Sequence, residues 1–379
     1  MDINSAILIK PLNNQSIVWF KNTNTYVLVA PETAQIIKQY FKGTKNGVLK
    51  NWIKETLNFS EKEIQVLLPP VLKLVKELNK KEVKDDTQLD FKSTDSPAVS
   101  KYYQIKNTCF KVDFQTENLT FLIHPKFEHL EVKGISKHNH HFEVFLNDRK
   151  IVFKTDGDYV GTWCADEIHY FQGKFSMKLV EKLYQKPERD WIGVFHASAL
   201  SDGKKNMMFL GDSGNGKSTL AALLVAQGYT LFADDFVPVE AKSKQIYYFP
   251  AAISIKEKAL EVLNSIFPKL KKTPQIDLAY INKSVRYLVA SPLKEKAVSH
   301  LPCKTLVFVK YQKNSGLKIE EIEKEDAFQK LIPDSWLSPL PKNAQQFLDW
   351  FEKLTCYSLT YSDNELMYQT VKKLYQDDL

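Results

Sequence analysis

Residues 211–235 read GDSGNGKSTLAALLVAQGYTLFADD, and this stretch decides the fold. Its first eight residues match the pattern G-x-x-x-x-G-K-[ST], in which backbone N–H groups turn inward around a phosphate at a helix N-terminus. The apolar run NMMFL (206–210) precedes the pattern, and leucines recur at helical spacing in a helix predicted over 217–227. The order strand, glycine loop, helix predicts a phosphate-binding α/β core. A glycine-rich turn before an ordinary helix is the alternative, but it would not require Lys217 and Ser218.

The pattern also assigns roles to individual residues. Lys217 is predicted to reach the β- and γ-phosphates of ATP, and the hydroxyl of Ser218 is predicted to bind Mg²⁺. The residues expected around the nucleotide are Gly211, Asp212, Ser213, Gly214, Asn215, Gly216, Lys217, Ser218 and Thr219.

An acidic pair closes the next predicted strand, residues 229–236. Asp234 and Asp235 begin seventeen residues after Lys217. Neighbouring side chains at a strand end point to opposite sides, so one carboxylate can hold a metal while the other faces an incoming hydroxyl. Two carboxylates after an apolar run are costly unless a cation or donor is nearby. A solvated acidic turn is the alternative interpretation.

Composition narrows the class of protein. The 379 residues allow two or three domains, and the hydrophobic share of 44% and charged share of 26% are ordinary for a soluble protein. The N-terminus lacks the pattern of a secretory signal, so we expect a cytoplasmic protein with no membrane association. The four cysteines form no C-x-x-C pair, which favours reduced thiols over a disulfide framework or a zinc site. Of 52 basic residues only three are arginines, so nucleic-acid binding is not favoured.

The pattern of apolar, charged and turn-forming residues along the chain predicts an N-terminal unit, a linker and a larger second domain. Residues 1–80 read as three short strands and three helices, a small winged-helix-like unit whose third helix opens with the capping box Ser60-x-x-Glu63 and resumes after Pro69 and Pro70. Residues 81–100 are charged and then rich in Ser, Asp and Pro, which predicts a linker. Residues 101–379 form the remaining domain, with a β-rich part over 101–190 and a nucleotide-binding core over 191–379. A strand is expected over 159–171 and a helix over 175–185.

The stretch 211–235 resembles the core of the HPr kinase/phosphorylase family of P-loop kinases. That family has the same spacing from the loop to Asp-Asp, and a histidine 21 residues before the loop lysine, as His196 is here. The resemblance is strong over 190–240 and extends more weakly over 101–379. It implies an ATP- and Mg-dependent phosphotransferase with an alcohol acceptor. In this enzyme Asp235 would accept the proton of a serine hydroxyl, and Asp234, with Ser218, would bind the metal. For His196, a catalytic role and that of a hydrogen-bonded histidine at a strand end both stay open.

The chain departs from the family in three places. Ser254 stands where the family has a metal-binding glutamate, which leaves a second metal site open. Arg286 is the only arginine in the C-terminal half and is the candidate for the family's catalytic arginine. The segment important for phosphorylase activity is not recognisable in residues 337–354. These departures favour a dedicated kinase over a bifunctional kinase/phosphorylase.

Residues 18–43 and the two helices after them resemble PqqD-like domains, which recognise ribosomally made precursor peptides. The resemblance implies that an exposed strand edge pairs with a leader segment. Residues 1–80 carry 11 lysines and 6 acidic residues, a charge that suits an acidic leader or DNA. No arginine is present in this unit for base readout, so peptide docking is favoured, with a plain packing domain as a further alternative.

These observations predict a kinase that phosphorylates a serine or similar hydroxyl on a precursor peptide or small protein docked by residues 1–80. A kinase of a free metabolite such as serine, a kinase of HPr protein, and a non-catalytic ATP-responsive regulator are the alternatives. The oligomeric state, including a homo-oligomer, is not readable from the sequence.

Overall fold

The computed structural model describes residues 6–80, 96–134, 137–278, 283–293 and 297–378, and it shows a mixed α/β chain with several sheets. The chain divides into two compact units. The first joins residues 6–80 to residues 322–356, and the second contains the described residues between 96 and 321 together with 357–378. Within the described ranges, none of the helices has the length and apolar character needed to cross a membrane.

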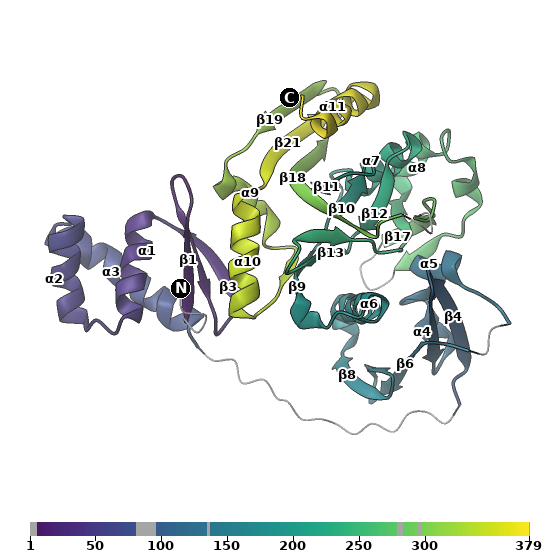
Figure 1. Cartoon of the computed structure of the whole chain (residues 1–379), viewed down its shortest axis with the longest axis horizontal. Helices are drawn as coiled ribbons and strands as arrows, with labels where there is room; N and C mark the ends of the chain where they lie inside the picture. Colours follow the sequence, from purple (N-terminus) through teal and green to yellow (C-terminus); the bar gives the residue numbers. More distant parts are fainter. Residues whose placement is uncertain (1–5, 81–95, 135–136, 279–282, 294–296, 379) are drawn as a thin grey trace. The chain divides into compact units, whose positions relative to one another are not determined.

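The first unit begins with an antiparallel sheet in the order β1 (Ile7–Pro11), β2 (Ser16–Phe20), β3 (Thr25–Val29). Helices α1 (Pro31–Phe41), α2 (Asn46–Leu57) and α3 (Glu61–Leu78) cover one face of this sheet (Figure 1). Alternate strand residues such as Val18 and Phe20 are buried in one cluster with the apolar faces of the helices. The predicted succession of three strands and three helices is confirmed.

Residues 322–356 cover the other face of this sheet with α9 (Lys324–Leu331), β20 (Ser335–Leu337) and α10 (Pro341–Glu352). The Tyr26 ring meets Phe347 edge-on at 5.4 Å between centroids, and Lys10 Nζ lies 2.6 Å from Glu352 Oε2. The sequence-based division placed this segment in the domain 101–379, so the structure differs from it. The physical reason is that β1–β3 is apolar on both faces, and the local pattern does not say which distant segment covers the second face.

Helix α3 corrects one expectation. The capping box is present, with Ser60 N donating to Glu63 Oε2 at 2.7 Å. The predicted interruption at Pro69 and Pro70 is wrong, because α3 runs unbroken through both prolines. They lie on its exposed side, while Leu68 and Val75 are buried on the other. Packing of that apolar face outweighs the loss of two backbone hydrogen bonds.

The second unit begins with a five-stranded sheet in the order β4 (Val99–Ile105), β5 (Thr108–Phe114), β6 (His140–Asn147), β7 (Lys150–Thr155), β8 (Asp158–Trp163). Two short helices, α4 (Glu117–Thr120) and α5 (His124–Phe127), followed by the turn η1 (Glu128–Leu130), connect β5 to β6. Of the predicted linker 81–100, residues 81–95 lie outside the described residues, and β4 begins before its predicted end.

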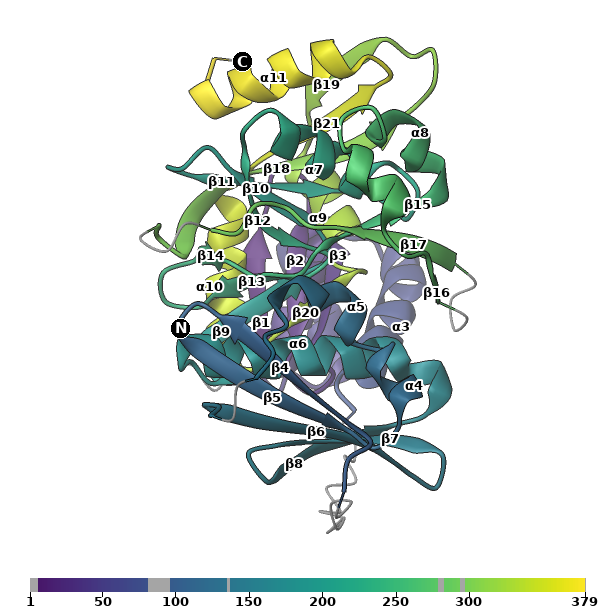
Figure 2. The ribbon, with the colours of Figure 1, turned by 90° about the vertical axis from the view of Figure 1, so that its right-hand side faces the viewer.

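Helix α6 (Ile168–Tyr184) lies across this sheet (Figure 2). Phe175 meets Phe142 and Phe153 at 5.3 and 5.4 Å between ring centroids. The predicted strand over 159–171 is wrong beyond Trp163, because residues from Ile168 onward belong to α6. Phe171 and Phe175 are spaced by one helical turn and both bury on the sheet, so the helical period outweighs the local β propensity.

A second sheet holds residues 206–234, the stretch in which the sequence predicts a phosphate-binding loop. Its central order is β12 (Thr230–Asp234), β10 (Ser198–Ser201), β11 (Asn206–Leu210), β18 (His300–Tyr311), β14 (Gln245–Tyr247), β13 (Val237–Glu240), β9 (Trp191–Phe195). β21 (Thr355–Tyr361) pairs with β18 and with β19 (Leu317–Glu321), and α11 (Asn364–Gln376) follows β21. β11 and β18 are parallel neighbours, so their carboxyl ends meet at one edge of the sheet.

A small three-stranded sheet completes the unit in the order β15 (Ile253–Lys256), β17 (Lys283–Leu288), β16 (Ile276–Leu278). The short helical pieces η4 (Glu257–Ala259), α8 (Leu260–Leu263) and η5 (Pro268–Lys272) connect β15 to β16. Ile253 and Ile255 are buried in the same core as Leu220 and Leu224 of α7 (Lys217–Ala226). The packing therefore places β15 beside the helix that follows the glycine loop.

Candidate phosphate-binding and phosphotransfer site

The loop over residues 211–216 joins β11 to α7 at the edge where β11 and β18 end. Tyr311 N donates to Asn215 O at 2.9 Å, which ties the loop to the end of β18. A Cβ atom on Gly211 would lie 2.6 Å from Val309 O, and Gly216 has a φ of 90°, in the left-handed region. Both positions therefore require glycine. The first turn of α7 begins directly after the loop, so its N–H groups face the space that the loop encloses.

The two acidic residues of the stretch have different surroundings. Asp234 ends β12 and is 3% exposed, and Ser198 Oγ on the neighbouring strand donates to its Oδ1 at 2.5 Å. Asp235 follows with a φ of 62°, and its N–H donates to Ala197 O at 2.9 Å. A left-handed aspartate is uncommon and marks a backbone held by its surroundings. This turn gives Asp235 a partly exposed carboxylate while Asp234 stays buried.

Asp235 lies between a lysine and a histidine. Lys217 Nζ is 3.4 Å from Asp235 Oδ1 and donates to His196 O at 3.3 Å. His196 Nδ1 is 3.7 Å from the same carboxylate oxygen. His196 comes from the turn between β9 and β10, Lys217 from α7 and Asp235 from the end of β12. The fold thus brings together His196, Lys217 and Asp235, which the sequence singled out, and it places Asp234 next to them.

The pKa values of Asp234 and Asp235 shift in opposite directions. Burial raises the pKa of Asp234, and the negative charge of Asp235 raises it further. Burial alone would also raise the pKa of Asp235, but the charges of Lys217, His196 and Lys126 outweigh that effect and lower it. Asp235 is therefore ionised at neutral pH and able to accept a proton, whereas the charge of Lys217 and the hydroxyls of Ser198 and Ser218 only partly offset the burial of Asp234.

The surroundings of Asp234 fit a divalent cation. Its Oδ2 is buried and, among the residues that the structure describes, has no hydrogen-bond partner. The Ser218 hydroxyl lies close enough to lower the pKa of Asp234. A carboxylate and a hydroxyl are the oxygen ligands that P-loop proteins offer Mg²⁺, and a bound cation would offset the remaining cost of burying the ionised carboxylate of Asp234. We infer that Asp234 and Ser218 fit the role of magnesium ligands.

Two lysines reach the site that the sequence did not single out. Lys256 on β15 donates from Nζ to Ser213 Oγ in the loop at 3.0 Å. Lys126 on α5 acts on Asp235 through its charge, and its carbonyl accepts a hydrogen bond from Ala252 N at 3.0 Å. Only the pairing and packing of distant elements brings these side chains to the loop. The nearest residue that the sequence singled out is Ser254, two positions before Lys256.

Arg286 is engaged elsewhere in the fold. It lies on β17 opposite Ile255, and its guanidinium donates to the carbonyl oxygen of Thr273, just after η5. The groups that lower the pKa of Asp235 are instead Lys217, His196 and Lys126. The role proposed for Arg286 at the transferring phosphate stays a prediction that its main contact does not favour. Ser254, on β15, brings no carboxylate, so the described site offers ligands for one metal ion.

Comparisons with known proteins give little further information. No protein-family model matches the chain, and no curated protein matches it. Among solved structures, the HPr(Ser) kinase/phosphatase from Coxiella burnetii is similar over 48% of this chain and 91% of its own, with 12% identity and a TM-score of 0.24. The chain is thus weakly similar in structure to this kinase/phosphatase. At that TM-score the assignment of function must come from the residues of the site.

Replacing Asp234 with Asn tests the metal site. An acid whose pKa is raised in the folded state destabilises that state as pH rises from its ordinary pKa of about 4. This penalty is complete once the pH passes the folded-state pKa of about 7. Without Mg²⁺, Asp234→Asn should therefore unfold at higher urea concentration than the native chain at about pH 8. The expected gain is on the order of 1–4 kcal/mol, and it should shrink toward about pH 4. Millimolar Mg²⁺ should stabilise the native chain and leave the variant unchanged. Equal stabilisation of both chains by Mg²⁺ would contradict the assignment.

Replacing Lys256 with Met tests the contact between β15 and the loop. Charge-assisted contacts to phosphate are strong, so the variant should bind a fluorescent ATP analogue about tenfold more weakly. Lys258→Met is the matched control, because Lys258 is exposed in η4 two residues further along. Equal affinities of the two variants would show that Lys256 only supports the loop.

Proposed function

We propose that the chain is an ATP- and Mg-dependent kinase that transfers the γ-phosphoryl group to a serine or similar hydroxyl on a peptide or small protein. The observation that carries this proposal is the ionised carboxylate of Asp235. It lies 3.4 Å from Lys217 Nζ at the start of α7, beside a buried acid with an unpartnered oxygen. A proton acceptor, a phosphate-binding lysine and oxygen ligands for a metal therefore lie side by side.

The reaction follows from these positions. The acceptor hydroxyl gives its proton to Asp235 while its oxygen forms a bond to the γ-phosphorus, and the bond from that phosphorus to the β-γ bridging oxygen breaks, which releases ADP. Lys217 and the N–H groups of the loop bind the phosphates and stabilise the charge that develops on them. A bound Mg²⁺ would neutralise part of the phosphate charge, held by Asp234 and Ser218.

Lys217 links nucleotide binding to proton transfer. Without nucleotide its charge holds the pKa of Asp235 down. When Lys217 contacts phosphate instead, that charge is shared with a second anion and Asp235 becomes a stronger base. His196 lies beside the same carboxylate and orients it. This position is compatible with both interpretations of His196, a catalytic residue or a hydrogen-bonded histidine at a strand end.

The first unit offers a docking surface for a peptide. β3 is an edge strand, since among described residues it pairs with β2 alone. A cavity of about 450 Å³ lies between the starts of α1 and α3, beside the end of β3, and Ala30, Phe59, Val66 and Leu67 are among its lining residues. An extended peptide can add a strand to such an edge and place a side chain in such a pocket. This pairing favours a peptide or small protein over a free metabolite such as serine.

Product analysis distinguishes the proposed function from its alternatives. A kinase of HPr protein or of free serine would use the same chemistry, so assaying HPr protein, serine and the candidate peptides side by side identifies the acceptor. A non-catalytic ATP-responsive regulator would bind ATP without transferring phosphate. The complete set of Lys217, Ser218, Asp234 and Asp235 supports a catalyst.

Replacing Asp235 with Asn tests the proposed base. The variant keeps the size of the side chain but cannot accept the hydroxyl proton, so transfer from labelled ATP to peptides encoded beside the gene should fall by at least about 100-fold. ATP binding should persist, since the loop is untouched. Asp202→Asn, in the exposed turn between β10 and β11, is the control and should keep full activity. Transfer that persists in the Asp235 variant would exclude this residue as the base.

Replacing Val66 with Glu tests peptide docking on the first unit. Val66 is 76% exposed and lines the cavity beside β3, so a charge there should raise the KM for the peptide about tenfold and leave the KM for ATP unchanged. Val48→Glu is the matched control, because Val48 is 61% exposed on α2 and does not line the cavity. Equal effects of both variants would remove the docking role from this surface.

A further inference from the structure

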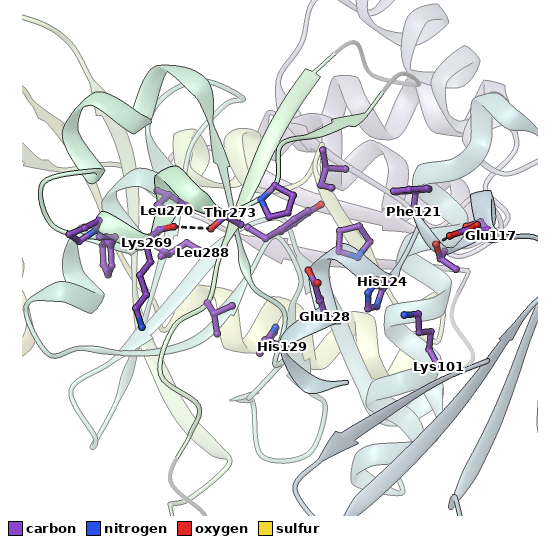
Figure 3. A pocket seen from close by; sticks show the side chains of 18 of the residues that line it. Lys101, Glu117, Phe121, His124, Glu128, His129, Lys269, Leu270, Thr273 and Leu288 are labelled. Atoms are coloured by element: carbon purple, nitrogen blue, oxygen red, sulfur yellow. Dashed lines mark hydrogen bonds between the residues drawn. The ribbon is translucent and has the colours of Figure 1, made fainter. Parts of the chain in front are cut away.

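A cavity in the second unit lies apart from the glycine loop, and none of its lining residues belongs to that loop. It has a volume of about 840 Å³, and residues between 99 and 129 and between 266 and 289 line it. One wall comes from α4, α5 and the segment between them, and the opposite wall comes from η5 and β17 (Figure 3). Its volume is typical of a site that encloses a ligand or a large side chain. Nothing in the phosphotransfer chemistry above uses it.

The lining mixes apolar and polar side chains, with the apolar ones in the majority. Leu270, Tyr287 and Leu288 are buried, while Phe121 and Val289, about half exposed, mark its mouth. Exposed apolar side chains that gather around one cavity indicate a surface that a partner covers. The side chains of Leu270 and Leu288 face those of Phe121 and His124 across the space in Figure 3.

The charges around this cavity cancel. Two lysines and two glutamates line it, namely Lys101, Lys269, Glu117 and Glu128. Lys101 Nζ is already paired with Glu131 Oε1 at 2.9 Å. His124 Nδ1 and the Tyr103 hydroxyl share a hydrogen bond of 3.0 Å. Burial lowers the pKa of the His124 ring, which keeps the ring neutral. The cavity therefore lacks the positive potential that a nucleotide or a phosphate would need.

Helix α5 connects this cavity to the proposed base. His124 and Pro125 line the cavity, and the next residue, Lys126, acts on Asp235 through its charge. Phe127 packs edge-on against Phe249 at 5.7 Å, on the segment whose Ala252 N–H binds Lys126 O. Pro125 and Lys126 are adjacent in α5, so a rise of only about 1.5 Å along the helix axis separates the backbone of a cavity-lining residue from that of the lysine whose charge acts on Asp235.

We propose that this cavity binds a bulky apolar side chain of the acceptor peptide, a few positions from the residue that is phosphorylated. An extended peptide advances about 3.3 Å per residue, so a chain whose hydroxyl lies at Asp235 can reach the cavity within a few residues. A free amino acid at Asp235 would be too short to cover the apolar mouth. This inference rests on the proposed kinase function and deepens it by naming a feature of the acceptor.

A peptide array tests the inference on the full chain. Each synthetic peptide carries one serine, and each flanking position in turn is Leu, Phe, Gly, Asp or Lys. With labelled ATP, the native chain should phosphorylate peptides with Leu or Phe at one particular position at least about tenfold faster than those with Asp there. Equal rates for all residues at every position would overturn the inference while leaving the kinase function intact.

Variants at the mouth show whether this cavity is the source of the preference. Ile266→Asp places a charge at a lining residue that is 39% exposed, and it should abolish the preference without changing the KM for ATP. Val262→Asp, at a residue that is 40% exposed on α8 and outside the cavity, is the matched control and should keep the preference. Ile266→Trp, which fills space without adding charge, should shift the preference toward smaller side chains.

The outcomes separate this inference from the function on which it rests. A preference that survives both Ile266→Asp and Ile266→Trp would overturn the assignment of the cavity. If no peptide is phosphorylated although the chain hydrolyses ATP, the proposed peptide kinase function fails and the inference fails with it.

Discussion

The buried carboxylate of Asp234 is the constraint around which the core of the second unit is arranged. An acid that is 3% exposed, with one oxygen that has no hydrogen-bond partner among the described residues, is tolerated only where neighbours or a cation offset the loss of water. Pairing of β10 with β12 brings Ser198 to one oxygen, and the start of α7 brings Ser218 near. The left-handed turn at Asp235 then moves the next carboxylate away from the first, and Lys217 meets it there.

Much of this site could be predicted because its main residues are close in the chain. A strand, a tight loop and a helix over 206–226 are fixed by local spacing, and the structure confirms their order. The acidic strand that follows is likewise local. Lys126 and Lys256 could not be predicted in this way, because Lys256 reaches the loop only after β15 packs against α7, and Lys126 comes near Asp235 only after α5 packs against residues 249–252. Side chains brought together by tertiary packing leave no spacing in the sequence.

The first unit illustrates the same limit at the level of a whole domain. The alternation in β1–β3 identifies two apolar faces, and the helices that follow directly account for one of them. The other face is covered by residues 322–356, almost 300 residues further along, where Phe328 and Phe347 meet Tyr26. Likewise Pro69 and Pro70 suggest a break in α3 on local grounds, but the buried face of the helix, which includes Val75, overrides them. Local rules give the elements, whereas burial decides their extent and their partners.

The scarcity of arginine has a consequence for how the site can work. The fixed cations at the loop and at Asp235 are lysines, from α7, α5 and β15. An arginine holds a carboxylate through a planar pair of hydrogen bonds, while a lysine is a point charge on a flexible stem that changes partner with little loss of geometry. In the proposed kinase, Lys217 would therefore leave Asp235 for a phosphate as the nucleotide enters. A rigid guanidinium pair at the same place would hold the proposed base in its weakened state, so lysine suits the proposed mechanism, in which nucleotide binding releases the carboxylate for proton transfer.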